Sequence, residues 1–154
     1  HEQVAPMAAS WPHPLPDGEA ERRIFAMRSC NAAGSGLVLA IAVKARPETL
    51  VGSIGGASAP DDGAFGFGYM LDPSLWGRGL MTEAVGAFAD IVLGFSPTTS
   101  LRASTMRRNP ASRRVLERNG FAQIGTAELH FPARGDSAIT CDSQGAYSSA
   151  VRLE

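Results

Sequence analysis

The spacing of apolar residues changes at one point of the chain, from that of a strand to that of a helix. Residues 64–71 form a short apolar run of strand length, and the next apolar positions recur on one helical face. These positions are Met81, Val85, Phe88 and Val92. Gly77-Arg78-Gly79 lies between the two patterns. Two glycines let a ligand approach the backbone closely, and a helix that starts behind them directs free N–H groups at the turn. We therefore predict a strand–turn–helix unit with an anion site.

The remaining apolar runs predict the other elements. Strands are expected at 37–43, 50–57, 64–71, 101–106, 121–131 and 146–153, and helices at 18–30, 81–93 and 109–119. Asp17 is the expected cap of the first helix, residues 46–48 form the expected hairpin turn, and 132–145 reads as a loop. Three consecutive strands indicate an antiparallel meander, so the order of elements predicts a mixed α/β (α+β) protein with one core.

The composition excludes several classes of protein. The chain has 154 residues, which favours a single domain over 1–154, and its formal net charge of -1 indicates no nucleic-acid partner. No apolar run approaches the roughly 20 residues of a membrane helix, and no signal peptide is visible, so we expect a cytoplasmic protein. Cys30 and Cys141 form no C-x-x-C pair, and the three histidines are scattered, so no metal site is expected.

Three interpretations compete for the glycine turn. A P-loop is excluded because no Gly-Lys-Ser/Thr follows. A dinucleotide fingerprint requires a third glycine where Thr82 stands, and an acid near residues 106–108, where the chain has Met-Arg-Arg. The third interpretation is a turn without a ligand, which a lone G-x-G would favour.

A second motif decides between them. Trp76-Gly-Arg-Gly-Leu-Met-Thr-Glu-Ala84 is followed by Asn109-x-x-Ser112-x-x-Val115-Leu116-x-x-x-Gly120-Phe121. This ordered pair resembles the GNAT superfamily of N-acetyltransferases, and within it the RimJ/RimL branch, which acetylates the N-termini of ribosomal proteins. The best-matched region covers roughly residues 64–125. The resemblance implies a GNAT-like acyl-CoA N-acyltransferase fold, whose mostly antiparallel sheet has helices on both faces and a splayed central strand pair.

The resemblance also implies a binding site for acetyl-CoA. The family pattern Gln/Arg-x-x-Gly-x-Gly/Ala maps onto Trp76, Gly79 and Met81, and the N–H groups of residues 77–82 would hold the CoA pyrophosphate. Met81 departs from the pattern, so its side chain must point away from the pyrophosphate, or the loop must shift. The residues implied to bind CoA are Met70, Leu71, Trp76, Gly77, Arg78, Gly79, Leu80, Met81, Thr82, Asn109 and Ser112.

The resemblance assigns three residues to the acyl-transfer step. The backbone N–H of Leu71 would hold the developing oxyanion, Asn109 would bond the pantetheine arm, and Ser112 would lie near the sulfur. On spacing alone, Asn109 is explained as a helix N-cap and Ser112 as an ordinary residue of the first helical turn, and the resemblance favours the functional role of both. The family's frequent tyrosine, seven residues after the asparagine, is Leu116 here.

No general base is placed by the motif. The position that is often acidic in the RimJ/RimL branch is Gly66. Glu128 is the candidate base, with His130 two residues away on the same strand face, although a solvated strand face is the favoured explanation of both. The family's first strand is not visible, so it either precedes His1 or is replaced by residues 4–9.

The predicted function is direct transfer of an acetyl group from acetyl-CoA to a primary amine in a ternary complex. The amine is either a protein N-terminus or a small molecule. The alternative is a non-catalytic module that binds acyl-CoA or has a regulatory role. We expect no metal, no nucleic acid and no membrane partner, and a homodimer is plausible.

Overall fold

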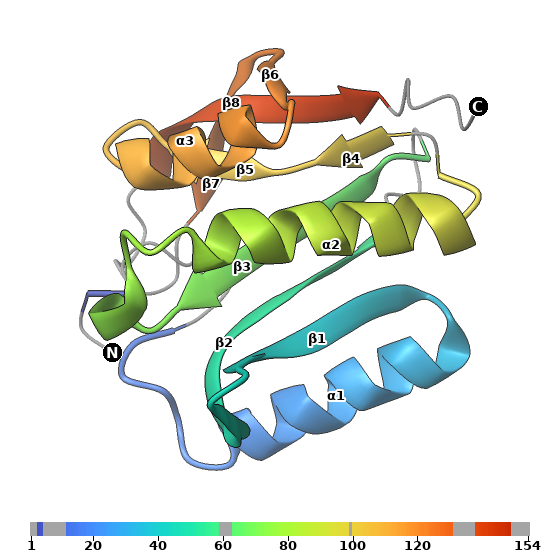
Figure 1. Ribbon diagram of the computed structural model, residues 1–154, viewed down its shortest axis with the longest axis vertical. Coiled ribbons are helices and arrows are strands. Elements are labelled where there is room, and N and C mark those ends of the chain that lie inside the picture. Colours follow the sequence, from blue (N-terminus) through green and yellow to red (C-terminus); the bar gives the residue numbers. More distant parts are fainter. Residues whose placement is uncertain (1–2, 5–11, 59–62, 99, 131–137, 149–154) are drawn as a thin grey trace.

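The computed structural model describes residues 3–4, 12–58, 63–98, 100–130 and 138–148 (Figure 1). Its elements, in chain order, are α1 (Glu19–Ala33), β1 (Gly36–Val43), β2 (Arg46–Ser58), β3 (Phe65–Leu71), the 3-10 turn η2 (Pro73–Leu75), α2 (Leu80–Phe95), β4 (Ser100–Arg102), β5 (Ser104–Met106), α3 (Pro110–Arg118), β6 (Ala122–Gln123), β7 (Thr126–His130) and β8 (Ala138–Ser148). Within these ranges, no helix is both long and apolar enough to cross a membrane.

The strands form one mixed sheet. β1, β2 and β3 make the predicted antiparallel meander, and β3 then pairs with β4 in parallel. β8 runs antiparallel to β4 and β5 on one side and to β6 and β7 on the other. The mixed α/β class is confirmed.

The central strands β3 and β4 separate soon after they meet. Their parallel pairing consists of Phe65 with Leu101 and Gly66 with Arg102. β5 continues beyond β4, but its recorded partner is β8. In the described chain, the half of β3 that ends at Leu71 therefore has a partner on one side only, as a splayed strand pair requires.

The core lies between α2 and the face of β3 that carries its aromatic residues. Phe88 of α2 lies 6.0 Å from Phe65 and 5.4 Å from Phe67 between ring centroids, and Phe67 lies 5.7 Å from Phe121. Figure 1 shows α2 lying in front of β3. The four apolar positions that the sequence places on one face of this helix are all buried: Met81, Val85, Phe88 and Val92. Burial of this face anchors α2 to the sheet.

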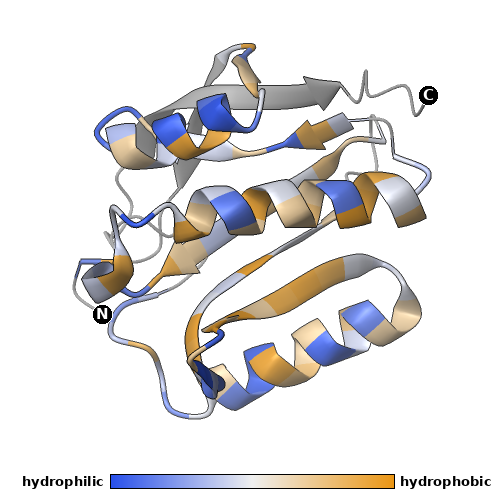
Figure 2. Cartoon of the chain, viewed as in Figure 1, coloured by the Kyte–Doolittle hydropathy of each residue, from blue (hydrophilic) through white to orange (hydrophobic). Residues whose placement is uncertain are grey.

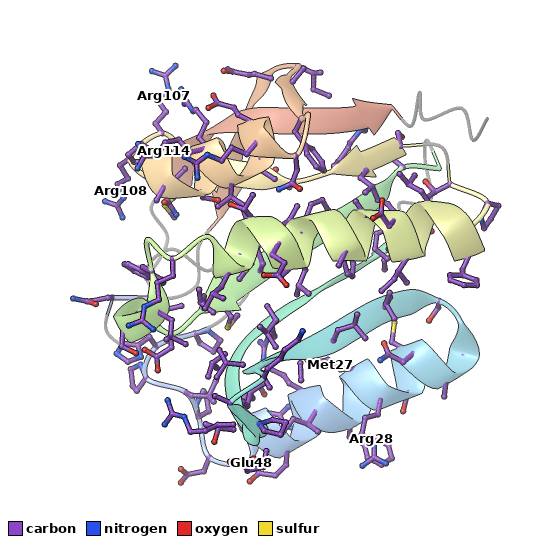
Figure 3. The ribbon with its side chains drawn as sticks, in the orientation of Figure 1. Met27, Arg28, Glu48, Arg107, Arg108 and Arg114 are labelled. Atoms are coloured by element: carbon purple, nitrogen blue, oxygen red, sulfur yellow. The ribbon has the colours of Figure 1, made fainter. Side chains whose placement is uncertain are left out.

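α1 lies along β1 and buries none of its side chains completely. The side-chain amide of Asn31 accepts a hydrogen bond from the N–H of Val38 and donates one to its carbonyl, both at 2.8 Å. Figure 3 shows Met27 on the side of α1 that faces β1, and Arg28 on the opposite side. The expected cap Asp17 is wrong, because the N-cap is Gly18 in a left-handed conformation without a side-chain hydrogen bond.

Other predicted boundaries are also corrected. The β1–β2 turn is Lys44–Ala45, and residues 46–48 belong to β2, because Arg46 already pairs with Val43. The single strand expected at 121–131 is divided into β6 and β7.

The C-terminal region departs most from the expectation. Residues 138–145, expected as part of a loop, form most of β8, which is stabilised by pairing on both sides. The rest of the expected loop and of the last strand, at 132–137 and 149–153, lies outside the described residues. So does nearly all of the segment 4–9, which was considered as a replacement for the missing strand.

Candidate active site

Side-chain hydrogen bonds of Asp72 and Trp76 stabilise the connection from β3 to α2. Asp72 accepts hydrogen bonds at Oδ1 from the backbone N–H of Ser74 at 2.8 Å and from its hydroxyl at 2.7 Å. These bonds lower the pKa of Asp72. The indole N–H of Trp76 donates to the carbonyl of Leu71 at 2.9 Å. The turn that follows therefore starts from a defined position relative to β3.

Gly77 and Gly79 both adopt left-handed backbone conformations, with φ of 75° and 79°. Other residues reach this region only at a cost in energy, so the two glycines are required by the path of the chain. Gly79 is the N-cap of α2 and provides no side-chain cap. In the described chain, the N–H groups of residues 77–82 form no hydrogen bond, so this helix start presents free donors.

The side chains of this turn leave those donors uncovered. Met81 is buried in the core beneath α2, so its side chain points away from the N–H groups. Arg78 is exposed and Trp76 is half exposed. Met81 departs from the family pattern, but its side chain is accommodated in the core without filling the turn.

The backbone of β3 also presents donors on its unpaired side. The N–H of Asp72 donates to the carbonyl of Val51 on β2 at 2.8 Å. Along an antiparallel strand, successive residues direct their N–H groups alternately toward and away from the partner. The N–H groups of Tyr69 and Leu71 therefore face the side where β3 separates from β4, while Met70 directs its N–H toward β2. Of the two β3 residues proposed from the sequence, only Leu71 has a suitably directed N–H.

α3 begins as the sequence predicts. The Oδ1 of Asn109 accepts a hydrogen bond from the N–H of Ser112 at 3.1 Å, and Pro110 occupies the first turn. The cap uses the amide oxygen of Asn109, so its amide N–H groups are the donors that can serve a ligand. Capping and ligand binding are thus compatible roles for this residue.

Asn119, at the other end of α3, connects the two helices. Its Nδ2 donates to the carbonyl of Thr82 at 3.1 Å and to that of Val115 at 2.9 Å. A Cβ added at Gly86 would lie 3.0 Å from the Oδ1 of Asn119, so the glycine allows this close approach. Asn119 therefore positions α3 relative to the first turn of α2. The sequence identified it only as the end of a helix.

Tyr69 connects β3 to the first turn of α3. Its hydroxyl oxygen lies 2.8 Å from the Oγ of Ser112, and its O–H also has the carbonyl oxygen of Ser112 as an acceptor at 3.2 Å. Burial raises the pKa of Tyr69 to about 12, and the hydrogen bond to Ser112 partly opposes that rise. Tyr69 was not among the residues proposed from the sequence, because a contact between residues 43 positions apart leaves no local pattern.

Glu128 lies on β7, and several arginines lie in or near α3. Glu128 pairs through its backbone with Thr140 of β8, and the side chains of β7 lie outside the description, so its role as a base stays a prediction. Arg107, Arg108 and Arg114 project from the corner where β5 leads into α3 (Figure 3). The electrostatic surroundings of this corner therefore favour anions.

Comparison with known proteins places this architecture in a family. Residues 1–122 match the model of the acetyltransferase (GNAT) domain. The probable N-acetyltransferase YjcK of Bacillus subtilis is 38% identical over 68 residues, which cover 44% of this chain and only 38% of that protein.

Solved structures share the fold. The ribosomal-protein-S5-alanine acetyltransferase of Vibrio fischeri superposes with a TM-score of 0.80 at 19% identity, over 97% of this chain and 81% of that one. RimJ of Mycobacterium smegmatis, solved in complex with CoA-disulfide, gives a TM-score of 0.81 at 17% identity, over 99% of this chain and 74% of that one.

Proposed function

The chain belongs to the GNAT acetyltransferase family, and from this premise we propose that it transfers an acetyl group from acetyl-CoA to a primary amine. The observation that carries the proposal is the set of free N–H groups at residues 77–82, which stand at the start of a helix anchored by its buried face. Donors of this kind suit a pyrophosphate, because the helix dipole adds to their hydrogen bonds. Arg78 contributes a positive charge beside them.

The unpaired half of β3 suits the pantetheine arm. The N–H groups of Tyr69 and Leu71 face the side where the arm would lie, as a free strand edge faces an added strand. We propose Asn109 as a further donor to the arm through its Nδ2. Met70, whose backbone bonds to β2, would contribute through its side chain alone.

The reaction is a direct acyl transfer. The amine nitrogen attacks the carbonyl carbon of the thioester, the C–N bond forms, and negative charge develops on the carbonyl oxygen. The N–H of Leu71 is the proposed donor to that oxygen, and a donor of this kind contributes about 3 kcal/mol to stabilising a transition state. The C–S bond then breaks, and its electron pair leaves on the sulfur, beside Ser112. Only the neutral amine attacks, and we retain Glu128 or water as the proton acceptor.

We also propose that the chain is a catalyst, and we propose where it acts. RimJ, which has the same fold, was solved in complex with CoA-disulfide, which supports a CoA site, and the relative from Bacillus subtilis is named a probable N-acetyltransferase, which supports catalysis. We propose that the chain acts in the cytoplasm, where acetyl-CoA is available. The homodimer expected from the sequence stays a prediction.

Calorimetric titration tests the proposal. The purified chain is titrated with acetyl-CoA and, separately, with NADPH. We expect a Kd in the micromolar range for acetyl-CoA and no heat of binding with NADPH. Failure of the folded protein to bind acetyl-CoA would contradict the proposal.

An amine screen then identifies the acceptor class. Release of free CoA thiol is followed with unblocked peptides, with the same peptides acetylated at the N-terminus, and with amino sugars and polyamines. Turnover with unblocked peptides alone would identify a protein N-terminus as the acceptor. Binding of acetyl-CoA without turnover by any amine would instead support the non-catalytic alternative.

A further inference from the structure

The hydroxyl group of Tyr69 is held against the first turn of α3 by two contacts with one residue. The shorter contact, 2.8 Å to the Oγ of Ser112, has the length typical of an O–H···O hydrogen bond. The longer one, 3.2 Å, is to the carbonyl oxygen of the same residue. The ring of Tyr69 packs against the core beside Phe67, at 6.2 Å between centroids. The hydroxyl position is therefore defined by the packing of the ring as well as by the hydrogen bonds.

Tyr69 has one proton and two acceptors within reach in Ser112, the Oγ and the carbonyl oxygen. Because the pKa of Tyr69 is about 12, its phenol keeps its proton at neutral pH and is available as a donor. When the phenol donates to the Oγ of Ser112, the shorter contact is satisfied and the proton of Ser112 is free for another acceptor. The N–H of Ser112 is already bonded to Asn109, so the backbone of this residue is also fixed.

A chain of donors ordered in this way polarises its last member. In the arrangement in which Tyr69 donates to the Oγ of Ser112, the O–H of Ser112 becomes a stronger donor. Proton transfer from Tyr69 to the sulfur is unfavourable. A thiolate whose pKa is near that of cysteine, about 8.5, is a weaker base than the phenolate of Tyr69, of pKa about 12, by a factor of about three thousand. We therefore expect the pair to stabilise a thiolate by hydrogen bonding.

We propose that Tyr69 is a positioning residue for acyl transfer, which orients the Ser112 hydroxyl so that it donates a hydrogen bond to the departing sulfur of CoA. The inference rests on the proposed function, since it requires the sulfur to lie beside Ser112. In this step the C–S bond breaks and its electron pair goes to the sulfur. The amine proton passes to the base or to water, and the released thiolate takes a proton from solvent.

The acidity of the bound CoA thiol tests the proposal without an amine substrate. Thiolate absorbance in the ultraviolet is followed with pH for the complex with CoA, and the spectrum of the complex with desulfo-CoA is subtracted to remove the protein and the adenine. A donor to the thiolate raises the acid dissociation constant of the thiol. We expect Ser112→Ala to lower that constant about tenfold relative to the wild type, as expected for a hydrogen bond to a charged group.

The variants separate positioning from a structural role. Tyr69→Phe retains the ring and removes the hydroxyl, and we expect it to lower the same constant about three- to tenfold. The double variant Tyr69→Phe/Ser112→Ala should match Ser112→Ala alone, because Tyr69 acts through the serine. Thr98→Val is the matched control. It removes a hydroxyl that donates to the carbonyls of Gly63 and Ser100, at 2.6 and 3.0 Å, near the start of β3. It should leave the constant unchanged.

Each result supports or overturns the inference. A bound thiol whose acidity is the same in wild type, Tyr69→Phe and Ser112→Ala would overturn it, and so would effects of the two substitutions that add in the double variant. A loss in Thr98→Val equal to that in Tyr69→Phe would assign both hydroxyls a structural role. If the folded wild type bound no CoA, the proposed function itself would fail, and this inference with it. Normal CoA binding with unchanged thiol acidity would overturn the inference alone.

Discussion

α1 and α2 begin in the same way, but different interactions hold them in place. They have 15 and 16 residues, and each follows a left-handed glycine, Gly18 or Gly79, that provides no side-chain cap. α2 buries five side chains beneath it, whereas α1 buries none. Figure 2 shows hydrophilic and hydrophobic residues mixed around α1, while the neighbouring strand β1 is mainly hydrophobic.

The two helix starts also differ in charge. The first turn of α1 carries Glu19 and Glu21, and Glu19 forms ion pairs with Arg22 and Arg23. Acidic side chains complement the positive end of a helix dipole, so α1 satisfies its own N-terminus. α2 has one acid in its first turn, the exposed Glu83, and the positively charged Arg78 comes just before the helix. The comparison suggests that an anion site requires free donors, little competing negative charge and a helix that cannot shift.

The largest expected difference between the helices is in stability. Phe88→Ala removes a ring that is 1% exposed and contacts Phe65 and Phe67, so we expect it to lower the free energy of unfolding by about 3–5 kcal/mol. Phe25→Ala, on α1, removes a ring that is 76% exposed and should change stability by less than about 0.5 kcal/mol. Urea denaturation followed by circular dichroism measures both. Equal losses would mean that α1 contributes to the core as α2 does.

The next prediction concerns the glycine turns. Gly79→Asp places a carboxylate at the proposed phosphate site, and we expect CoA affinity to fall at least about a hundredfold, or about 2.7 kcal/mol. Gly79→Asn has nearly the same shape without the charge, and asparagine tolerates left-handed conformations, so it should retain more affinity. Gly18→Asp introduces a comparable strain at α1, because both glycines are left-handed and a Cβ at either meets no atom within 4 Å.

Calorimetry with CoA compares the three variants. Gly18→Asp should bind CoA as the wild type does. A similar loss in Gly79→Asn and Gly79→Asp would show that backbone strain, and not charge, controls the site. Unchanged affinity in Gly79→Asp would mean that residues 77–82 do not hold the pyrophosphate.

The sequence predicts correctly those features of the helices that follow local rules. The buried face of α2 and the cap of α3 follow local rules, a helical period and an asparagine–proline start, so both are predicted correctly. The cap of α1 is predicted wrongly, because the N-cap is Gly18 and not Asp17, the better capping residue beside it. None of the side chains of α1 is buried, so its sequence has little apolar pattern that could indicate where the helix begins.

Features that depend on distant partners are missed. β8 is expected as a loop over most of its length, because its stability comes from strands on both sides and not from an apolar pattern. Asn119 bonds to Thr82 and Tyr69 to Ser112 across separations of 37 and 43 residues. Motif spacing identifies the groups proposed to touch CoA, but the residues that hold those groups in place become visible only in the folded chain.

The smallest expected effect concerns how α1 is attached. Because α1 contributes no buried side chain, the two hydrogen bonds between Asn31 and the backbone of Val38 are a main link to β1, which is the last strand at this end of the described sheet. Asn31→Ala removes both bonds, yet the site is exposed and water replaces them, so we expect a loss of only about 1 kcal/mol. Asn31→Asp keeps the acceptor for the N–H of Val38 and loses the donor to its carbonyl, so its loss should be smaller.

Hydrogen exchange gives this last prediction a local readout. The amide of Val38 and those of α1 should exchange faster in Asn31→Ala, while the amides of α2 keep their protection, because the two helices belong to separate units of stability. CoA affinity should not change, since Asn31 and Val38 belong to α1 and β1, outside the proposed site. Faster exchange throughout α2 would show that α1 supports the active-site helix through the sheet. The independence of the two helices, on which the comparison rests, would then be wrong.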